Sequence, residues 1–367
     1  MNKFLFVCLA FFINSPFLAA QQADTTHYDE ERTVIKEIIA LQNGVPHGDY
    51  VRFYPEEGIA ERGSFAAGKR QGIFVSYFPH SSDTLRTIHF DAGLRSGKAI
   101  TYHQNGHIAQ EAYFHKDMLQ GEVKTYYESG QLQTLTPMVD NHPHGKKESY
   151  YEEGGIKETV ELAHGVPEGE SVRYDVEGNK IAIAIYRNGK LSGPSLTFYV
   201  KGQPESEIHY KEGLRHGAYL IFYPDQQIKE EGNYRQGIPH GTFSTYHADG
   251  QLASVTSYRR GTIRGKSQTF YPSGQAQSVT DHDKWGQPVL QEEFYENGRL
   301  RKKVFFSGGL EHGDQITYHE NGEISEIIPY EQGKLSGTYQ KFDEKGKLLQ
   351  ERSFENGKEL TPNGVRK

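Results

Sequence analysis

Hydrophobic and polar residues alternate along this chain in short runs that end at glycine-rich turns. In the segment Gly241-Thr-Phe-Ser-Thr-Tyr246, for example, apolar and polar side chains follow one another, and a turn sequence comes next. Alternation with a period of two is typical of a half-buried β-strand and does not fit the 3.6-residue period of a helix. The pattern therefore predicts an all-β protein made of hairpins.

A recurring glycine defines the period of the pattern. It returns every 24 residues, with one step of 25, and it is counted here as position 0 of each repeat: Gly48, Gly72, Gly97, Gly121, Gly145, Gly169, Gly193, Gly217, Gly241, Gly265, Gly313 and Gly337. Val289 stands where one further glycine is expected. Position +5 is aromatic in all thirteen repeats: Phe53, Tyr77, Tyr102, Tyr126, Tyr150, Tyr174, Phe198, Phe222, Tyr246, Phe270, Phe294, Tyr318 and Phe342.

Two kinds of turn are expected in each repeat. A glycine recurs at position +9, and Pro55, Pro79, Pro224 and Pro272 precede that position by two residues. This spacing predicts a three-residue hairpin loop with a glycine bulge. The loop is expected to place position +5 on one face with the apolar residues at +11 and the aromatic residues at +17. The second turn has a glycine at position −4, which Asp117 and Asn141 replace, as expected where a left-handed backbone is required.

The expected architecture is a set of tandem 24-residue β-hairpin repeats that form an elongated, twisted antiparallel meander ribbon of about thirteen repeats. The repeat array is assigned to residues 34–357, where residues 35–41 begin the array as a half-unit. Residues 21–33 are assigned to an N-terminal linker and residues 358–367 to a C-terminal tail. Each repeat advances the ribbon by roughly 10 Å, since neighbouring strands lie about 4.8 Å apart.

The N-terminus has the pattern of a secretory signal peptide. Lys3 precedes a short apolar stretch, and Leu18-Ala-Ala20 supplies small residues for cleavage, so residues 1–20 are expected to be removed. The single cysteine, Cys8, lies within this segment. The mature chain is therefore expected to be exported, to the periplasm, the cell surface or the medium, and no later segment is apolar enough to span a bilayer.

Composition and charge narrow the possible functions. The net charge is −7 with acids and bases interspersed, so neither a nucleic acid nor an anionic lipid is expected as partner. The sequence contains no recognisable nucleophile, zinc-helix or phosphate-loop motif, which predicts a non-catalytic protein without cofactor or metal. Five histidines precede a position-0 glycine and are interpreted as turn residues, with pH-sensitive binding or a metal site as alternatives: His47, His144, His216, His240 and His312.

The repeat resembles a known family. Phe294-Tyr-Glu-Asn-Gly-Arg-Leu300 and Tyr318-His-Glu-Asn-Gly-Glu-Ile324 are similar to the unit of the MORN repeat variant, and the chain looks most like bacterial proteins called YwqK-type antitoxins. The resemblance covers roughly residues 35–357. It implies a β-hairpin ribbon that binds a protein partner, and the antitoxin label implies neutralisation of a toxin.

Aromatic residues supply the candidate binding positions. Tyr186, Tyr210, Tyr234 and Tyr258 occupy position +17 of four consecutive repeats and are expected either to pack across strands or to line a ligand groove. Trp285, the one tryptophan, is interpreted as a gap filler or as an exposed binding anchor. The connection at 281–289 is expected to kink the array and divide it into a longer and a shorter stretch.

Three functions are open from the sequence. The first is a protein-binding or scaffolding module. The second is a module that binds glycans or the cell wall, because rows of tyrosine can stack on sugars. The third is a toxin-neutralising protein, as the family resemblance implies.

Overall fold

The structure is a computed structural model that describes residues 22–360 as strands and turns, without helices in that range. It divides into two compact units, residues 1–166 and 167–367. The signal peptide expected at residues 1–20 lies outside the described residues. None of the residues 22–360 belongs to a helix that is long and apolar enough to span a membrane.

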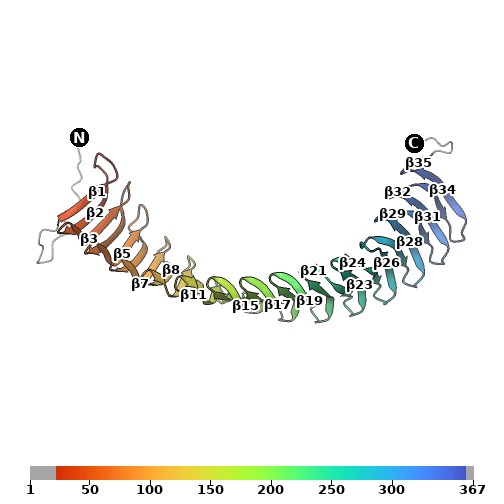
Figure 1. Ribbon diagram of the computed structural model, residues 1–367, viewed down its shortest axis with the longest axis horizontal. Coiled ribbons are helices and arrows are strands. Elements are labelled where there is room, and N and C mark those ends of the chain that lie inside the picture. The colour runs from red at the N-terminus through yellow and green to blue at the C-terminus, as the bar shows by residue number, and fades with distance from the viewer. Residues whose placement is uncertain (1–21, 361–367) are drawn as a thin grey trace. The chain divides into compact units, whose positions relative to one another are not determined.

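Strands of the N-terminal unit follow one another along the sequence (Figure 1). They are β1 (Gln22–His27), β2 (Ile35–Gln42), β3 (Val45–Phe53), β4 (Ile59–Ala66), β5 (Lys69–Tyr77), β6 (Thr84–Asp91), β7 (Leu94–Tyr102), β8 (Ile108–His115), β9 (Met118–Leu119), β10 (Gly121–Tyr126), β11 (Leu132–Val139), β12 (His142–Pro143), β13 (Gly145–Tyr150) and β14 (Ile156–Ala163).

The C-terminal unit repeats the same order. Its strands are β15 (Val166–Tyr174), β16 (Lys180–Arg187), β17 (Lys190–Phe198), β18 (Pro204–Lys211), β19 (Leu214–Phe222), β20 (Ile228–Arg235), β21 (Ile238–Pro239), β22 (Gly241–Tyr246), β23 (Leu252–Arg259), β24 (Thr262–Ile263), β25 (Gly265–Phe270), β26 (Ala276–His282), β27 (Pro288–Phe294), β28 (Leu300–Ser307), β29 (Leu310–Glu311), β30 (Gly313–Tyr318), β31 (Ile324–Glu331), β32 (Lys334–Leu335), β33 (Gly337–Phe342), β34 (Leu348–Glu355) and β35 (Lys358–Leu360).

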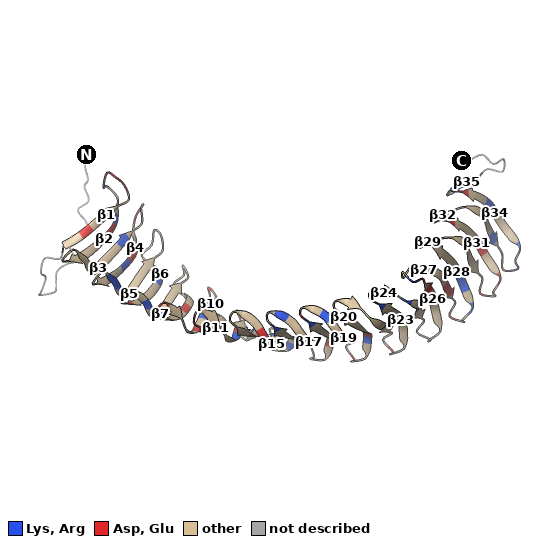
Figure 2. Cartoon of the chain, viewed as in Figure 1, with Lys and Arg blue, Asp and Glu red and all other residues tan. Residues whose placement is uncertain are grey.

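Within each unit, strands that are neighbours in the sequence pair antiparallel. In the N-terminal unit β3 pairs with β4 and β4 with β5, and in the C-terminal unit β17 pairs with β18 and β18 with β19. The prediction of an all-β meander of hairpin repeats is therefore confirmed for the described residues. Acidic and basic residues are interspersed along both units (Figure 2).

Both expected turns are present. In the loop after β25, the amide of Tyr271 donates to the carbonyl of Gln275 and the amide of Gly274 donates to the carbonyl of Tyr271. This is the three-residue loop with a glycine bulge, and Gly274 has a φ of 82°. At position −4 Asp117 and Asn141 have φ values of 67° and 68°, which confirms that these residues replace glycine because the backbone there is left-handed.

The terminal assignments differ from the structure. Residues 22–27, which were assigned to the linker from the sequence, form β1 and pair with β2. Residues 358–360, which were assigned to the tail, form β35 and pair with β34. Both strands lack the aromatic and glycine columns of the repeat, and each is held by the backbone of a neighbouring strand.

The expected arrangement of the faces was right for positions +5 and +11 and wrong for position +17. Positions +5 and +11 do pair, as Phe53 does with Ile59, but the register shifts by one residue between Arg52 and Phe53. The same shift recurs in the other repeats, as between Thr245 and Tyr246. A bulge of this kind reverses the alternation beyond it. Position +17 therefore faces away from +5 and +11, and Phe65 packs on Tyr50 at position +2.

Two faces can now be defined for every repeat. Face A carries positions +3, +5, +11 and +14, whereas face B carries positions −2, +2, +4, +13, +15 and +17. The pairing of Gly48 with Phe65 and of Tyr50 with Gly63 places these residues together on face B. The pairing of Val51 with Arg62 places those two on face A.

Candidate binding surfaces

Successive repeats are joined at both ends of their strands. We call the end with the loop around position +9 the hairpin edge and the end with the turn at position −4 the turn edge. At the hairpin edge, the residue at position +6 donates to the backbone carbonyl at position +5 of the next repeat, as Tyr223 Oη does to Tyr246 O at 2.8 Å and His247 Nε2 to Phe270 O at 3.0 Å. At the turn edge, the amide at position −4 donates to a carbonyl of the preceding turn, as Gly237 does to Arg215 at 2.8 Å. These tyrosines and histidines therefore hold the array together.

Sequence reasoning missed the role of position +6. The signal was present, because Tyr or His occupies this position in ten of the thirteen repeats: Tyr54, His103, Tyr127, Tyr151, Tyr199, Tyr223, His247, Tyr271, Tyr295 and His319. The tyrosine hydroxyl and histidine Nε2 are both hydrogen-bond donors at the far end of an aromatic ring. Their interchange in one column indicates a shared donor role.

Face B of the N-terminal unit holds a buried aromatic cluster. The N-terminal aromatic cluster consists of Tyr50, Phe65, Phe74 and Phe90, and Phe74 is only 2% exposed. The ring of Phe74 lies against the backbone at Gly63, where an added Cβ would come within 2.6 Å of the ring. A glycine at position +15 thus makes room for a large ring at position +2 of the next repeat. Arg70 covers the cluster, with its guanidinium 4.3 Å from the Phe74 ring centroid.

Face B of the C-terminal unit repeats this arrangement. The C-terminal aromatic cluster consists of Tyr219, Tyr234, Phe243 and Tyr258, with ring centroids 5.3 Å apart for Tyr234 and Phe243 and for Phe243 and Tyr258. Gly232 makes room for Phe243, because an added Cβ there would lie 2.3 Å from the ring. For Tyr234 and Tyr258 the cross-strand packing interpretation is therefore confirmed.

The other two tyrosines of the predicted set lie in the same column. Tyr210 and Tyr186 are half-buried and pair with Arg215 and Leu191 on the next strand. Tyr234 also contacts Arg215, whose Nη1 lies 3.4 Å from the tyrosine hydroxyl. Partner binding by these tyrosines stays a prediction.

A hollow on face B lies next to the N-terminal aromatic cluster. Its volume is about 370 Å³, and position +2 there carries small residues in place of the large rings at Tyr50 and Phe74. We call it the alanine hollow; it is lined by Arg86, Ile88, Arg95, Ala99, Thr101, Gln110, Ala112, Phe114, Leu119, Val123, Thr136 and Met138.

The rim of the alanine hollow carries two arginines with different environments. Arg95 Nε bonds Asp117 Oδ1 at 2.9 Å, and the Arg95 guanidinium lies 4.2 Å from the Phe114 ring centroid, so this side chain is fixed. Arg86 is exposed. The hollow therefore combines an apolar floor with a cation at its edge, a combination that suits an apolar side chain next to an acidic group.

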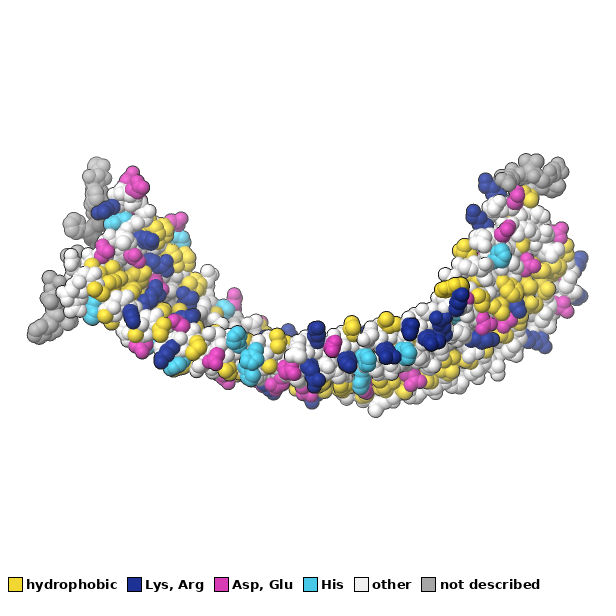
Figure 3. Space-filling model, in the orientation of Figure 1, with side chains coloured by type: hydrophobic (Ala, Val, Ile, Leu, Met, Phe, Trp, Pro, Cys, Tyr) yellow, Lys and Arg dark blue, Asp and Glu magenta, His cyan; other side chains and the backbone are white. Residues whose placement is uncertain are grey.

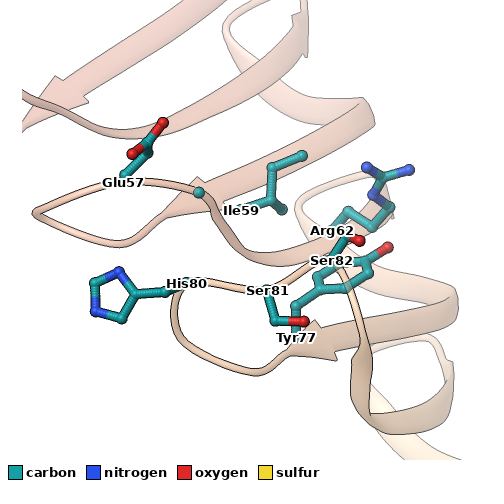
Figure 4. A pocket seen from close by; sticks show the side chains of 8 residues that line it. Glu57, Ile59, Arg62, Tyr77, His80, Ser81 and Ser82 are labelled. Atoms are coloured by element: carbon teal, nitrogen blue, oxygen red, sulfur yellow. The ribbon is translucent and has the colours of Figure 1, made fainter. Parts of the chain in front are cut away.

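A second hollow, of about 400 Å³, lies at the hairpin edge of the N-terminal unit (Figure 4). Arg62 and Tyr77 lie together in it, with the guanidinium 5.3 Å from the ring centroid, whereas Glu57 and His80 point away from it. The hydroxyl of Ser81 bonds Asp83 at 2.7 Å. No nucleophile and base converge here, so the geometry is that of turn residues.

Trp285 lies at the tip of the irregular connection and is 69% exposed. The gap-filling interpretation is therefore wrong, because the indole contacts solvent and the ammonium group of Lys284, 4.2 Å from its ring centroid. The amide of Trp285 donates to Asp283 Oδ1 at 2.9 Å, whereas the glycines at this position in other repeats donate to the preceding turn. Its role as a binding anchor stays a prediction.

The connection at 281–289 has changed its turn but has not interrupted the sheet. Asp283 and Gln287 close a loop of the kind found at hairpin edges, with the bulge at Gly286, whose φ is 84°. The ladder is regular from Ser278 to Asp281 and then shifts register before His282, which leaves Val289 as the extra residue of a bulge. Val289 is not among the residues with a positive φ, so this position does not require glycine. The expected division at this connection is not observed, since β26 pairs with β27 and the compact units divide at residue 166.

Where the pKa of a titratable group is shifted among the described residues, the shift moves it away from neutral pH. Burial, with help from Glu37 and Glu61, raises the pKa of Tyr50 to about 12. A hydrogen bond from Lys98 lowers the pKa of Glu111. Between residues 22 and 360, three or more His, Cys, Asp or Glu side chains do not gather in a way that could hold a metal ion. Absence of catalysis remains a prediction.

Comparison with known proteins identifies the repeat. The model of the MORN repeat variant matches residues 95–116, 119–140, 215–236, 239–260, 311–332 and 335–356. The chain is a MORN repeat protein. Proteins of this kind are binding modules built from repeats, which agrees with the regular hairpin array described above.

Other comparisons add little. The curated proteins include no match to this MORN repeat protein. Among solved structures, a mutant of S. aureus TarM in complex with Fondaparinux, alpha-GlcNAc-glycerol and UDP is 14% identical, with a TM-score of 0.18, over 36% of this chain and 21% of that chain.

Two further structures are similarly distant. The Photorhabdus luminescens Tc holotoxin pore is 11% identical with a TM-score of 0.16. The match covers 92% of this chain and 22% of the holotoxin chain. A protein of unknown function from Bacteroides caccae is 14% identical with a TM-score of 0.15 and covers 70% of this chain and 89% of that chain. The MORN repeat protein thus spans about a fifth of the length of the first two chains, and similarities this weak carry no functional argument.

Proposed function

We propose that this MORN repeat protein is an exported, non-catalytic scaffold that binds a protein partner in the alanine hollow on face B. The observation that supports the proposal is the change at position +2, where the large rings of Tyr50 and Phe74 give way to Ala99 and Val123. In the two repeats that precede the hollow, the array fills the same space with its own aromatic side chains.

The chemistry of the hollow describes the partner. An apolar side chain of the partner would contact Ala99, Ala112 and Phe114, and a carboxylate next to it would meet the exposed Arg86. Hydrophobic and cationic side chains lie side by side over β3 to β7 (Figure 3), and the residues that line the hollow follow on β6 to β11. A partially apolar patch bordered by charge is typical of protein interaction sites on a rigid repeat surface.

A variant that fills the hollow tests the proposal. Ile88→Gly with Ala99→Phe reproduces the glycine and phenylalanine pair that Gly63 and Phe74 form one repeat earlier. Wild type and variant, each immobilised, are exposed to the proteins of the exporting compartment, and captured proteins are identified by mass spectrometry. We expect at least one protein that wild type captures and the filled variant does not.

The matched control places the same pair in the C-terminal unit. Ala184→Gly with Ser195→Phe occupies the same two positions of the repeat, away from the hollow. We expect this control to capture the partner as wild type does. Equal capture by the filled variant and wild type, with both folded by circular dichroism, would exclude the hollow as the binding site.

Toxin neutralisation would be one form of such protein binding. It rests on the family resemblance alone, and it predicts that the captured partner is toxic to cells when it is produced without this protein. Glycan or cell-wall binding is the second candidate, because half-buried tyrosines recur at position +17 of four repeats. Retention on insoluble cell-wall material, and its loss with added soluble sugar, would favour that candidate.

A further inference from the structure

The turn edge of the C-terminal unit carries a row of cations that the net charge of the chain conceals. Position +18 is Arg187, Lys211, Arg235 and Arg259 in four consecutive repeats, which we call the basic ladder, and all four side chains are exposed. In the N-terminal unit the same position is Ala66, Asp91, His115, Val139 and Ala163. Lys and Arg side chains gather over this part of the C-terminal unit (Figure 3).

The cations of the basic ladder are available to a ligand. Among the described residues, none of the four makes an ion pair, whereas Lys266 and His209 nearby are paired with Asp281 and Glu207. Each ladder residue follows a position +17 tyrosine and so projects to the opposite face. The ladder is thus distinct from the aromatic packing on face B.

The centre of the ladder is hollowed. A space of about 530 Å³ is lined by Arg235, His240, Arg259 and Arg260, with Ile238 and Pro239 as its apolar part. Three arginines line one hollow, and guanidinium donors match carboxylate and sulfate oxygens in pairs. The apolar side chains supply a surface for the C–H faces of a sugar ring.

We propose that the turn edge of the C-terminal unit binds a linear acidic polysaccharide along the basic ladder and in the hollow at its centre. The ladder presents one cation per repeat, roughly every 10 Å, because each repeat adds two strands about 4.8 Å apart. A polymer with one acidic group in every second sugar fits such widely spaced cations. A DNA strand carries a phosphate about every 3.4 Å, so most of its charges would have no cation opposite.

Defined oligosaccharides test this inference independently of the protein partner, whose proposed site is in the other unit. Hyaluronan oligosaccharides of increasing length, which carry one carboxylate per two sugars, are titrated into the full chain by calorimetry at low and high salt. We expect the affinity to rise with length until an oligosaccharide spans the four repeats, because each added contact is intramolecular. We also expect salt to weaken binding.

Three variants locate the site. Arg235→Ala with Arg259→Ala and Arg260→Ala is expected to lower the affinity about tenfold or more, since each exposed ion pair contributes modestly and three are lost. A second variant changes the same three arginines to lysine. It keeps the positive charge and is expected to retain most of the binding. The matched control changes Lys201, Lys345 and Lys347 to alanine, exposed cations in hairpin loops of the same unit, and is expected to bind as wild type.

Several outcomes would overturn the proposal. An equal loss of affinity in the variant with three arginines changed to alanine and in the control with Lys201, Lys345 and Lys347 changed to alanine would show that net charge alone, without a site, attracts the polymer. If a single-stranded DNA of 20 nucleotides or polyglutamate bound the protein as tightly as hyaluronan does, a polysaccharide site would be excluded. Affinity that does not change with oligosaccharide length would exclude the ladder.

Discussion

The two aromatic clusters of this protein use the same positions of the repeat and differ in how much water they exclude. In both clusters a ring at position +2 lies on a glycine at +15, and an arginine at −2 covers the rings. In the N-terminal cluster position +17 is phenylalanine and three rings are buried, whereas in the C-terminal cluster it is tyrosine and all four rings are half-buried. Ring contact with glycine therefore sets the geometry of both clusters.

The arginine has a different partner in each cluster. Arg70 Nη2 bonds Glu61 Oε2 at 3.0 Å, and Arg215 Nη1 bonds the Tyr234 hydroxyl at 3.4 Å. A carboxylate holds a guanidinium more strongly than a neutral hydroxyl does. The N-terminal cluster is consequently expected to be the more rigid of the two, and four measurements can break or sharpen this comparison.

The largest expected effect is the loss of the central ring. Phe74→Ala should destabilise the N-terminal unit by about 3–5 kcal/mol, the usual cost of removing a buried phenylalanine. Phe243→Ala should cost roughly half of that, because the ring is half-buried. Denaturant unfolding followed by hydrogen exchange in each unit measures both changes. Equal losses in the two units would contradict the difference in burial.

The next effect comes from filling the space beneath each ring. Gly63→Ala and Gly232→Ala should each cost about 1–3 kcal/mol, because the new Cβ forces the ring away from its position. A leucine at Phe74 or Phe243 leaves more room and should reduce the penalty of the alanine in a double-mutant cycle. A cycle in which the two changes simply add would show that the ring and the glycine do not interact.

A third effect should be the same in both units. Tyr54→Phe and Tyr223→Phe remove hydroxyls that bond Tyr77 O at 2.7 Å and Tyr246 O at 2.8 Å. Each loss should cost about 1 kcal/mol, the net contribution of a typical hydrogen bond. Tyr223→His is the matched control, since histidine fills this role at His247, and it should retain most of the stability. Wild-type stability in both phenylalanine variants would argue against the hydroxyl bond.

The smallest effect appears only at alkaline pH. Burial raises the pKa of Tyr50 to about 12 from an unfolded value near 10. Between these values the unfolded chain loses the proton first, so the free energy of unfolding of the N-terminal unit falls as the pH rises from 10 to about 12. Tyr50→Phe should remove that part of the pH dependence in alkaline unfolding curves. An unchanged slope in this variant would assign the effect to other tyrosines.

Local sequence determined the repeat and its turns. Left-handed backbone at position −4 restricts that position to Gly, Asp or Asn in most repeats, and the bulge at +9 selects glycine. These are conformational requirements of a few adjacent residues, and they can be predicted without knowing what the strand packs against. The family resemblance rests on the same residues.

Candidate sites were only partly predictable. The tyrosines at position +17 were identified, but the alanine hollow was not, because Ala99 and Ala112 are small residues without a signal of their own. The basic ladder was visible at position +18 of the repeat, yet the net charge of −7 concealed it. Exposure of Trp285 depended on a connection whose turn differs from the others.

Tertiary structure alone decided which side chains meet. The sequence determined the period, the turns and the all-β class, because each depends on backbone conformations that a few neighbouring residues prefer. The assignment of Phe65 to the face of Tyr50 depended on a one-residue register shift between paired strands. Such a shift is set by hydrogen bonds between strands, and it reverses the alternation that a single strand displays. For that reason the faces, the glycine beneath each ring, and the hollow beside them became apparent only when the strands were paired.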